Sequence, residues 1–161
     1  MNLRLAQVNE DNFFDVINLK SDEVQEKYIQ IYERWVGSNA FFLAMCQTHG
    51  FIARAIYDGD VLIGFTSHGF SKGLNQYELN SMMLGHQFQG KGYGAPVLQA
   101  IIDDMVQAYQ CDSIYLSVIE DNERAIRVYE KLGFRPTGEV VLGHHPEPVY
   151  CLTLTQAAAG Q

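Results

Sequence analysis

The sequence predicts a single mixed α/β domain whose sheet begins with antiparallel strands. An Asp-Gly pair at residues 58–59 lies between two apolar runs, as in a tight β-hairpin. A glycine-rich segment at residues 89–94 precedes apolar residues at helical spacing, and β-rich segments follow. The 161 residues fit one domain with a core that needs no disulfide or metal. We expect this domain over residues 1–155 and a flexible tail over residues 156–161.

A strand, two helices and three further strands are expected in the first half of the chain. Leu3–Val8 alternates apolar and polar residues, which is typical of a half-buried strand. Helical spacing indicates two helices, over Asp11–Leu19 and Glu23–Trp35. Apolar runs then predict three strands, the first two joined as the hairpin: Phe51–Tyr57, Val61–Phe65 and Tyr77–Leu84.

The second half predicts two helices separated by a strand. The first spans Tyr93–Tyr109, with Pro96 in the first turn, where proline is tolerated. Ser113–Ile119 is β-rich, and the next helix should begin after Asn122, a good N-terminal cap, and stop at Gly133. Two final strands are expected over Val140–Leu142 and Val149–Leu154.

Charge and cysteine content exclude several classes of function. The net charge of −8 and the pI near 5.0 disfavour non-specific nucleic-acid binding, which requires a basic surface. The three cysteines lack the spacing of a disulfide framework or a zinc site, so we expect a reducing compartment and no metal. The N-terminus has no signal-peptide pattern, and no apolar run reaches the ~18 residues of a membrane span. We therefore expect a cytoplasmic location.

A glycine-rich loop joins a predicted strand to a predicted helix: Gln89-Gly90-Lys91-Gly92-Tyr93-Gly94. Glycines at such a junction adopt positive φ readily and let the backbone approach a ligand closely. The first turn of the helix adds unpaired N–H groups and a partial positive charge, which together form an anion site. A merely tight turn rarely needs three glycines within five residues. The loop therefore predicts a pyrophosphate-binding site.

Two other phosphate-binding motifs also have glycine-rich loops. The GxxxxGK[ST] pattern of P-loop nucleotidases is absent. Gly90, Gly92 and Ala95 satisfy the GxGxx[GA] pattern of dinucleotide-binding folds, and Glu120 follows the next strand. That fingerprint should open a parallel βαβ array, whereas here it follows an antiparallel hairpin and only about 70 residues remain. A dinucleotide cofactor is therefore the weaker alternative.

Two motifs resemble the GNAT family of N-acetyltransferases. Gln89-x-x-Gly92-x-Gly94 is similar to the acetyl-CoA signature Q/R-x-x-G-x-G/A of that family. The stretch from Asn122 to Phe134, NERAIRVYEKLGF, is similar to its second motif and stands at the expected spacing. The resemblance is strong over residues 77–138. It implies the acyl-CoA N-acyltransferase fold, a splayed and mostly antiparallel sheet with helices on both faces.

The resemblance also implies which residues bind acetyl-CoA as a co-substrate. Backbone groups of Met82, Met83 and Leu84 would bind the pantetheine arm like an additional strand, and an amide there, such as that of Leu84, would polarise the thioester carbonyl. Asn122 would either cap its helix only or also contact the cofactor arm. The pyrophosphate would be held by backbone amides of the glycine loop: Gln89, Gly90, Lys91, Gly92, Tyr93, Gly94 and Ala95.

By the same resemblance, Tyr129 is the general acid that protonates the departing coenzyme A thiolate. The competing interpretation is a core tyrosine on the apolar stripe of its helix. Several family members carry a carboxylate at the position of Asn80, where this chain has an amide that cannot act as a base. Glu78, two residues away, should face the same side; it would either receive the proton of the amine, directly or through water, or be simply a solvated strand residue. The missing carboxylate also supports another class of protein, a non-catalytic acetyl-CoA-binding module.

Within the family, the pattern is most similar to bacterial diamine and polyamine (spermidine/spermine) acetyltransferases. One shared stretch is WVGSNA at residues 35–40, which would lie beside the acceptor cleft. The implied substrate-binding residues are Trp35, Ser38, Asn39 and Asn80, and the negative charge of the chain favours a polycation. The alternatives are a protein N-terminal or lysine amine and an amine antibiotic. A homodimer would also be in keeping with the family.

Overall fold

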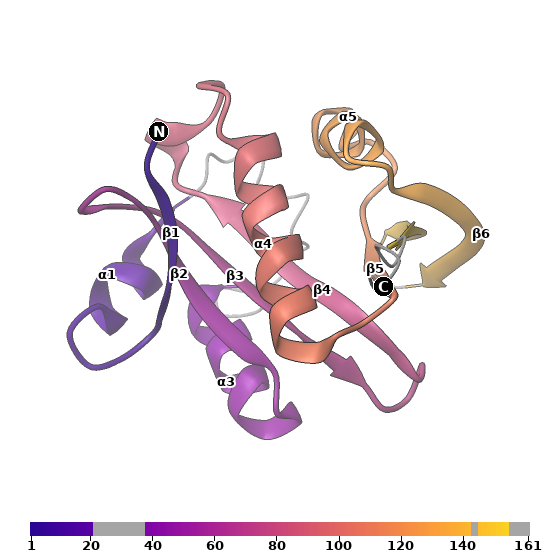
Figure 1. Ribbon diagram of the computed structural model, residues 1–161, viewed down its shortest axis with the longest axis horizontal. Coiled ribbons are helices and arrows are strands. Elements are labelled where there is room, and N and C mark those ends of the chain that lie inside the picture. Colours follow the sequence, from indigo (N-terminus) through magenta and orange to yellow (C-terminus); the bar gives the residue numbers. More distant parts are fainter. Residues whose placement is uncertain (21–37, 143–144, 155–161) are drawn as a thin grey trace, which may run out of the picture.

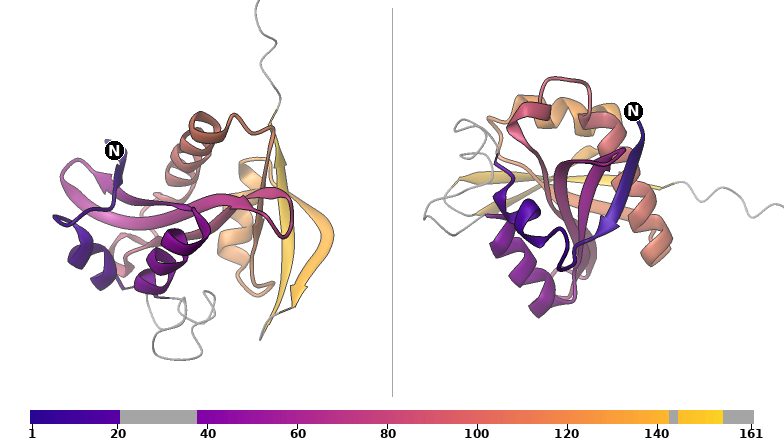
Figure 2. Two further views of the ribbon diagram at one scale, coloured as in Figure 1. Left: turned by 90° about the horizontal axis from the view of Figure 1, so that it is seen from below. Right: turned by 90° about the vertical axis from the view of Figure 1, so that its left-hand side faces the viewer.

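The computed structural model describes residues 1–20, 38–142 and 145–154. The helix predicted over Glu23–Trp35 and the tail at residues 156–161 lie outside these ranges. The described residues form one seven-stranded sheet with helices on both of its faces (Figure 1, Figure 2). The predicted mixed sheet is confirmed. Within the described ranges, no helix is long and apolar enough to cross a membrane.

Seven strands form the sheet: β1 (Leu3–Gln7), β2 (Ile52–Asp58), β3 (Val61–Ser71), β4 (Gln76–Leu84), β5 (Ser113–Ser117), β6 (Arg135–Leu142) and β7 (Pro146–Thr153). Their order across the sheet is β1-β2-β3-β4-β5-β7-β6. Every neighbouring pair is antiparallel except β4 and β5, which run parallel. The predicted hairpin is confirmed, because Asp58 at the end of β2 pairs with Val61 at the start of β3.

The described helices are α1 (Phe13–Asn18), α3 (Asn39–His49), the 3-10 turn η1 (His86–Phe88), α4 (Gly94–Tyr109) and α5 (Glu123–Lys131). Helices α1, α4 and α5 confirm predictions, although α1 is shorter than expected. Helix α3 is not predicted by the sequence analysis. The Oγ of Ser38 caps it by accepting from the Phe41 amide at 3.1 Å, and Gly50 ends it at a φ of 70°. Phe42 and Leu43 pack from this helix against the core, but its apolar residues are not confined to one face, so the sequence shows no apolar stripe.

The sheet separates two hydrophobic cores, and helices lie on both of its sides (Figure 2). Helix α4 packs on one face through Val97, Leu98 and Ile101, which are fully buried, and α5 joins this core through Val128. Helices α1 and α3 cover the other face, where Val16 lies in the second core. The glycine loop at the start of α4 is thus attached to a firmly packed helix.

A β-bulge in β4 changes the face to which its residues point. Residues 67 and 68 of β3 pair with Ser81 and Leu79, so Asn80 is the additional residue. Leu79 packs in the α4 core, whereas Met83 packs in the core under α1 and α3. These two residues are four apart and would share a face in an uninterrupted strand. The bulge therefore decides which side chains of β4 point to each side of the sheet.

The parallel strands β4 and β5 separate soon after they meet. Their registered pair is Glu78 with Tyr115, whereas on its other side β5 pairs with β7 along its whole length. The edge of β4 from residue 79 to residue 84 is therefore not covered by β5. This opening lies where the family resemblance implies a cofactor, between the strand before the glycine loop and the strand before Asn122.

Strand β6 is longer than the sequence predicts. It begins at Arg135 instead of Val140 and pairs with β7 at both ends. A register shift between Pro136 and Val140 interrupts the pairing, and Gly138 adopts a φ of 90° there. This bulge contains glycine and follows proline, so it interrupts the alternation of residues from which a strand is predicted.

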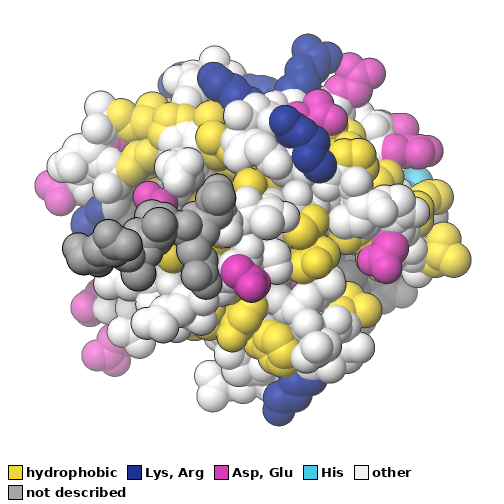
Figure 3. Space-filling model, turned by 45° about the vertical axis from the view of Figure 1, so that its right-hand side comes forward, with side chains coloured by type: hydrophobic (Ala, Val, Ile, Leu, Met, Phe, Trp, Pro, Cys, Tyr) yellow, Lys and Arg dark blue, Asp and Glu magenta, His cyan; other side chains and the backbone are white. Residues whose placement is uncertain are grey.

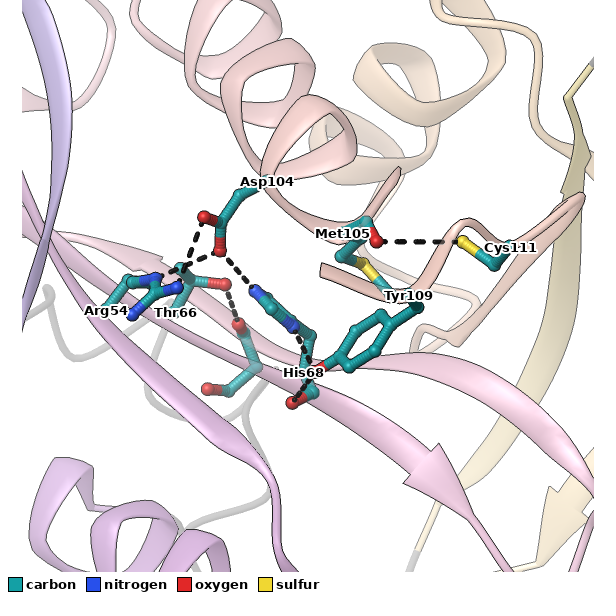
Figure 4. A network of polar contacts seen from close by, with 8 residues as sticks. Arg54, Thr66, His68, Asp104, Met105, Tyr109 and Cys111 are labelled. Atoms are coloured by element: carbon teal, nitrogen blue, oxygen red, sulfur yellow. Dashed lines mark hydrogen bonds and ion pairs between the residues drawn. The ribbon is translucent and has the colours of Figure 1, made fainter. Parts of the chain in front are cut away.

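A partly buried polar network around His68 ties α4 to the sheet (Figure 4). Asp104 on α4 accepts hydrogen bonds from Arg54 Nε at 3.0 Å and from His68 Nε2 at 2.8 Å. His68 Nδ1 lies 2.9 Å from the Tyr109 hydroxyl. Burial lowers the pKa of the His68 imidazole, so the neutral ring donates to Asp104 and accepts from Tyr109. The network holds the second half of α4 in place against β2 and β3.

Candidate active site

A cavity of about 670 Å³ lies where β4 and β5 separate, a volume typical of small-molecule sites. Its lining comes from the end of β4, the glycine loop, the end of β5, helix α5, the first turns of α3 and one residue of β7. Figure 3 shows the side of the molecule that carries β5, β7 and α5, with most of the visible Lys and Arg side chains along its upper edge.

The glycine loop forms one end of this cavity. Gly90 and Gly92 have φ values of 73° and 83°, in the left-handed region that favours glycine. A Cβ on Gly94 would lie 3.2 Å from Cγ2 of Val128, so glycine there lets α4 begin close against α5. The loop and the N–H groups of the first turn of α4 border the cavity, and this arrangement can hold a pyrophosphate.

Two side chains of the glycine loop hold it in place. The Tyr93 hydroxyl donates to Asp58 Oδ2 at 2.6 Å, which connects the loop to the β2–β3 turn. That hydrogen bond lowers the pKa of the Asp58 carboxyl and raises the pKa of Tyr93. Gln89 Nε2 donates to the Leu84 carbonyl at 3.0 Å. Gln89 and Tyr93 therefore shape the loop through their side chains as well as line the cavity.

The end of β4 forms a second wall. Met82, Met83 and Leu84 line the cavity, as expected of a cofactor-binding strand. Their antiparallel partners lie on β3, and the edge of β4 on the other side is open. An extended ligand with amide groups can pair with that edge as a further strand would.

Tyr129 lies on α5 and lines the cavity. The side chain is half-buried, and burial raises the pKa of its hydroxyl to about 12. Its ring packs against Phe134, with 6.0 Å between the ring centroids. Among the described residues, no hydrogen bond occupies the hydroxyl, which stays protonated at neutral pH and can donate to a ligand. Asn122 caps this helix, because its Oδ1 accepts from the Ala125 amide at 3.3 Å, and it also lines the cavity.

Three cations of α5 line the same side of the cavity, which we call the α5-side wall: Arg124, Arg127 and Lys131. Arg127 pairs with the exposed Glu123 at 2.7 Å, whereas no carboxylate of the described residues pairs with Arg124 or Lys131. Arg124 Nη2 lies 3.3 Å from the position that a Cβ on Gly90 would take, directly beside the glycine loop. In a chain of net charge −8, this concentration of cations favours an anionic ligand.

The opposite side of the cavity, which we call the α3-side wall, is formed by Asn39, Phe42, Ser117 and Glu147. Asn39 is buried and donates from Nδ2 to the Val16 carbonyl at 2.8 Å. The Ser117 hydroxyl donates to Glu147 Oε2 at 2.6 Å. Glu147 cannot be found from the sequence alone, because only the pairing of β5 with β7 brings it to the cavity.

The remaining predicted site residues do not all line the cavity. Asn80 lines the cavity and donates to Ser67 Oγ at 3.3 Å, whereas Lys91 and Glu78 are not lining residues. The Glu78 carboxylate accepts from Gln76 Nε2 at 3.0 Å at the closed end, where β4 and β5 still pair. Ser38 caps α3, and Trp35 lies outside the described residues. Within the described ranges, no group of three or more His, Cys, Asp or Glu side chains is placed to hold a metal ion.

A splayed parallel strand pair with a glycine loop at one end defines a class of protein, the acyl-CoA-dependent transferases. The chain matches the Acetyltransferase (GNAT) family over residues 10–134, and it belongs to that family. A spermine/spermidine N(1)-acetyltransferase of Bacillus subtilis (strain 168) is 27% identical over 146 residues, which cover 87% of this chain and 92% of that protein. Family members transfer an acetyl group from acetyl-CoA to an amine, so this chain is an N-acetyltransferase by family.

Two solved structures share the fold. Spermidine N-acetyltransferase from Vibrio cholerae, in complex with CoA and spermine, has a TM-score of 0.76 and 18% identity, with 94% of this chain and 95% of that chain covered. An aminoglycoside acetyltransferase in complex with coenzyme A has a TM-score of 0.74 and 18% identity, with 94% of each chain covered. Enzymes with different acceptors thus have this architecture, so the acceptor has to be argued from the residues of the cavity.

Proposed function

We propose that the chain acetylates a primary amine of a diamine or polyamine, using acetyl-CoA in a ternary complex. The observation that supports this most directly is the charge of the cavity, cationic along α5 and anionic at Glu147. Acetyl-CoA brings phosphates to the α5-side wall, and a polyamine brings ammonium groups to the α3-side wall. The similarity to the spermine/spermidine enzyme of Bacillus subtilis, over 87% of this chain, supports the same class of acceptor.

In this proposal, the cofactor occupies the opening between β4 and β5. The pyrophosphate lies against the amides of the loop from Gln89 to Ala95, with Arg124 beside it. The pantetheine arm pairs with the free edge of β4 at Met82, Met83 and Leu84, and Asn122 contacts that arm from the start of α5. Apart from Lys91, these residues already border the cavity.

Gly92→Val is expected to weaken coenzyme A binding by more than tenfold. A Cβ on Gly92 would meet no atom within 4 Å, so the added side chain would enter the space assigned to the cofactor. Gly138→Val is the matched control, because Gly138 has a similar φ of 90° and open surroundings but lies on β6. Both variants carry the strain of a left-handed valine, about 1–2 kcal/mol. Calorimetric titration with coenzyme A distinguishes them, and equal affinities would contradict the assignment.

The chemistry follows from the groups around the proposed thioester. The neutral amine attacks the carbonyl carbon, a C–N bond forms, and the C–S bond then breaks to release the thiolate. An amide of β4, such as that of Leu84, stabilises the oxyanion. Tyr129 donates a hydrogen bond to the leaving sulfur, whose thiol pKa is about 8.5. With a Tyr129 pKa of about 12, complete transfer would cost about 5 kcal/mol, so the hydroxyl acts mainly as a donor that stabilises the developing charge.

The acceptor nitrogen must lose a proton, and we assign its removal to Glu78 through water. Asn80 leaves no base at the bulge, and Glu78 is not a lining residue, so direct contact is not proposed. Glu78→Gln should lower the rate most at low pH, where the amine is protonated, and the rate should recover as the pH approaches the amine pKa of about 10.4. Parallel pH–rate profiles for the variant and the wild type would show that water alone takes the proton.

A panel of amines tests the proposed acceptor. Purified protein with acetyl-CoA is offered spermidine, spermine, a short diamine, a peptide with a free N-terminus, a lysine peptide and an aminoglycoside, and thiol release is followed. We expect the highest kcat/KM for the polyamines or the diamine. Rapid acetylation of a peptide or an aminoglycoside alone would overturn the acceptor class. Coenzyme A binding without thiol release on any amine would favour a non-catalytic module.

A further inference from the structure

We propose that Glu147 binds the ammonium group of the acceptor that is remote from the acetylated nitrogen, and so selects polyamines over monoamines. The proposal rests on the proposed function. It assigns a specificity-determining role to a residue that the family motifs do not include. Three features of the cavity support it: the face on which Glu147 lies, the charges opposite it, and the hydrogen bond that orients its carboxylate.

Glu147 on β7 and Ser117 on β5 point to the same face of the sheet. Ser117 pairs with Val149, two residues from Glu147, and residues two apart on a strand share a face. The neighbouring residues Leu116 and Tyr150 point to the other side, into the core under α4. Glu147 therefore approaches the cavity from the side of α3, away from the α5-side wall.

The charges of the two walls would orient a polycation. Glu147 is the one carboxylate among the described residues that line the cavity, and the charged residues of the α5-side wall are all cations. A bound polyamine is repelled from that wall and attracted to β7. Its charged nitrogen is therefore held at Glu147, while the other end of the chain extends toward the thioester.

The carboxylate is oriented before an acceptor arrives. The Ser117 hydroxyl donates to Oε2 at 2.6 Å, a short hydrogen bond to a charged acceptor. Among the described residues, Oε1 has no partner and can accept from an ammonium N–H. A carboxylate stabilises the charged form of an amine, whereas the attacking nitrogen must be neutral. Glu147 is therefore suited to the nitrogen that does not react.

The test compares spermidine with butylamine, which has one amine and no second charge. Glu147→Gln keeps the size of the side chain and an acceptor for Ser117 but removes the negative charge. We expect the KM for spermidine to rise roughly 10- to 100-fold, the effect of one hydrogen bond to a charged group. The ratio of kcat/KM for spermidine to that for butylamine should fall by a similar factor. Glu139→Gln, on the exposed strand β6, is the control for the same change in net charge.

Each outcome supports or overturns the proposal. A ratio that stays within threefold of the wild type, or one that falls equally in Glu139→Gln, overturns it. A wild-type protein that acetylates neither spermidine nor a diamine contradicts the proposed function instead. In that case, calorimetric binding of spermidine to the coenzyme A-loaded protein still tests Glu147. Weaker binding in Glu147→Gln supports the assignment, and unchanged binding refutes it.

Discussion

Replacing Tyr129 by phenylalanine is expected to lower the turnover number by about 10²–10³, the usual loss when one hydrogen-bond donor to a developing negative charge is removed. The ring would keep its packing against Phe134, so the fold and the affinity for coenzyme A should be close to those of the wild type. The measurement is kcat with saturating acetyl-CoA and the best amine of the panel. A turnover number within threefold of the wild type would return Tyr129 to a packing role.

Tyr57→Phe is the matched control for this substitution. Tyr57 is a half-buried tyrosine on β2, under the Arg4 guanidinium and outside the cavity, so its hydroxyl should not affect turnover. The raised pKa of Tyr129, about 12, adds a second test. Because the hydroxyl remains protonated up to that pH, the wild-type rate should show no decline near pH 10 from loss of the Tyr129 proton, in contrast to an ordinary tyrosine with a pKa of about 10.

Asp104→Ala is expected to lower the free energy of unfolding by about 2 kcal/mol, the scale of leaving a buried hydrogen-bond donor without its acceptor. The substitution leaves the Arg54 guanidinium and the Nε2–H of the fully buried His68 without their shared acceptor. Urea unfolding at neutral pH gives the value, and an unchanged slope against urea shows that the unfolded state is the same.

Asp103→Ala provides the control on the same helix. Asp103 is exposed and accepts only an exposed hydrogen bond from Gln99, so its loss should change stability by about 0.5 kcal/mol or less. Equal losses in the two variants would mean that the network around His68 contributes little.

The lowered pKa of His68 also predicts how the free energy of unfolding depends on pH. The folded state binds fewer protons there, so this stability is present above pH ~6.5 and is lost as the pH falls below it.

The parts of the fold that the sequence predicts are those fixed by local chemistry. The Asp58-Gly59 turn, the start of α4 and the Asn122 cap each depend on residues within a few positions of one another. The glycine loop is predicted for the same reason, since its conformation follows from positive φ at Gly90 and Gly92.

The features that the sequence does not predict depend on pairings between distant positions. Ser117 and Glu147 are 30 residues apart, and His68 and Asp104 are 36 apart. Neither pair can be found from periodicity, because only the completed sheet brings the partners together. Helix α3 is not predicted from the sequence for a different reason. Its start is fixed by Ser38, but its sequence does not concentrate apolar residues on one face.

The bulge at Asn80 makes the length of β4 as important as its composition. Deleting Asn80 itself would leave Leu79 opposite His68 and Ser81 opposite Ser67, so the remaining side chains would keep their present sides of the sheet. A deletion nearer the end of the strand, with the bulge retained, would instead turn the residues that follow it to the opposite face. During evolution, β4 should therefore lose a residue at the bulge more readily than between Ser81 and Leu84.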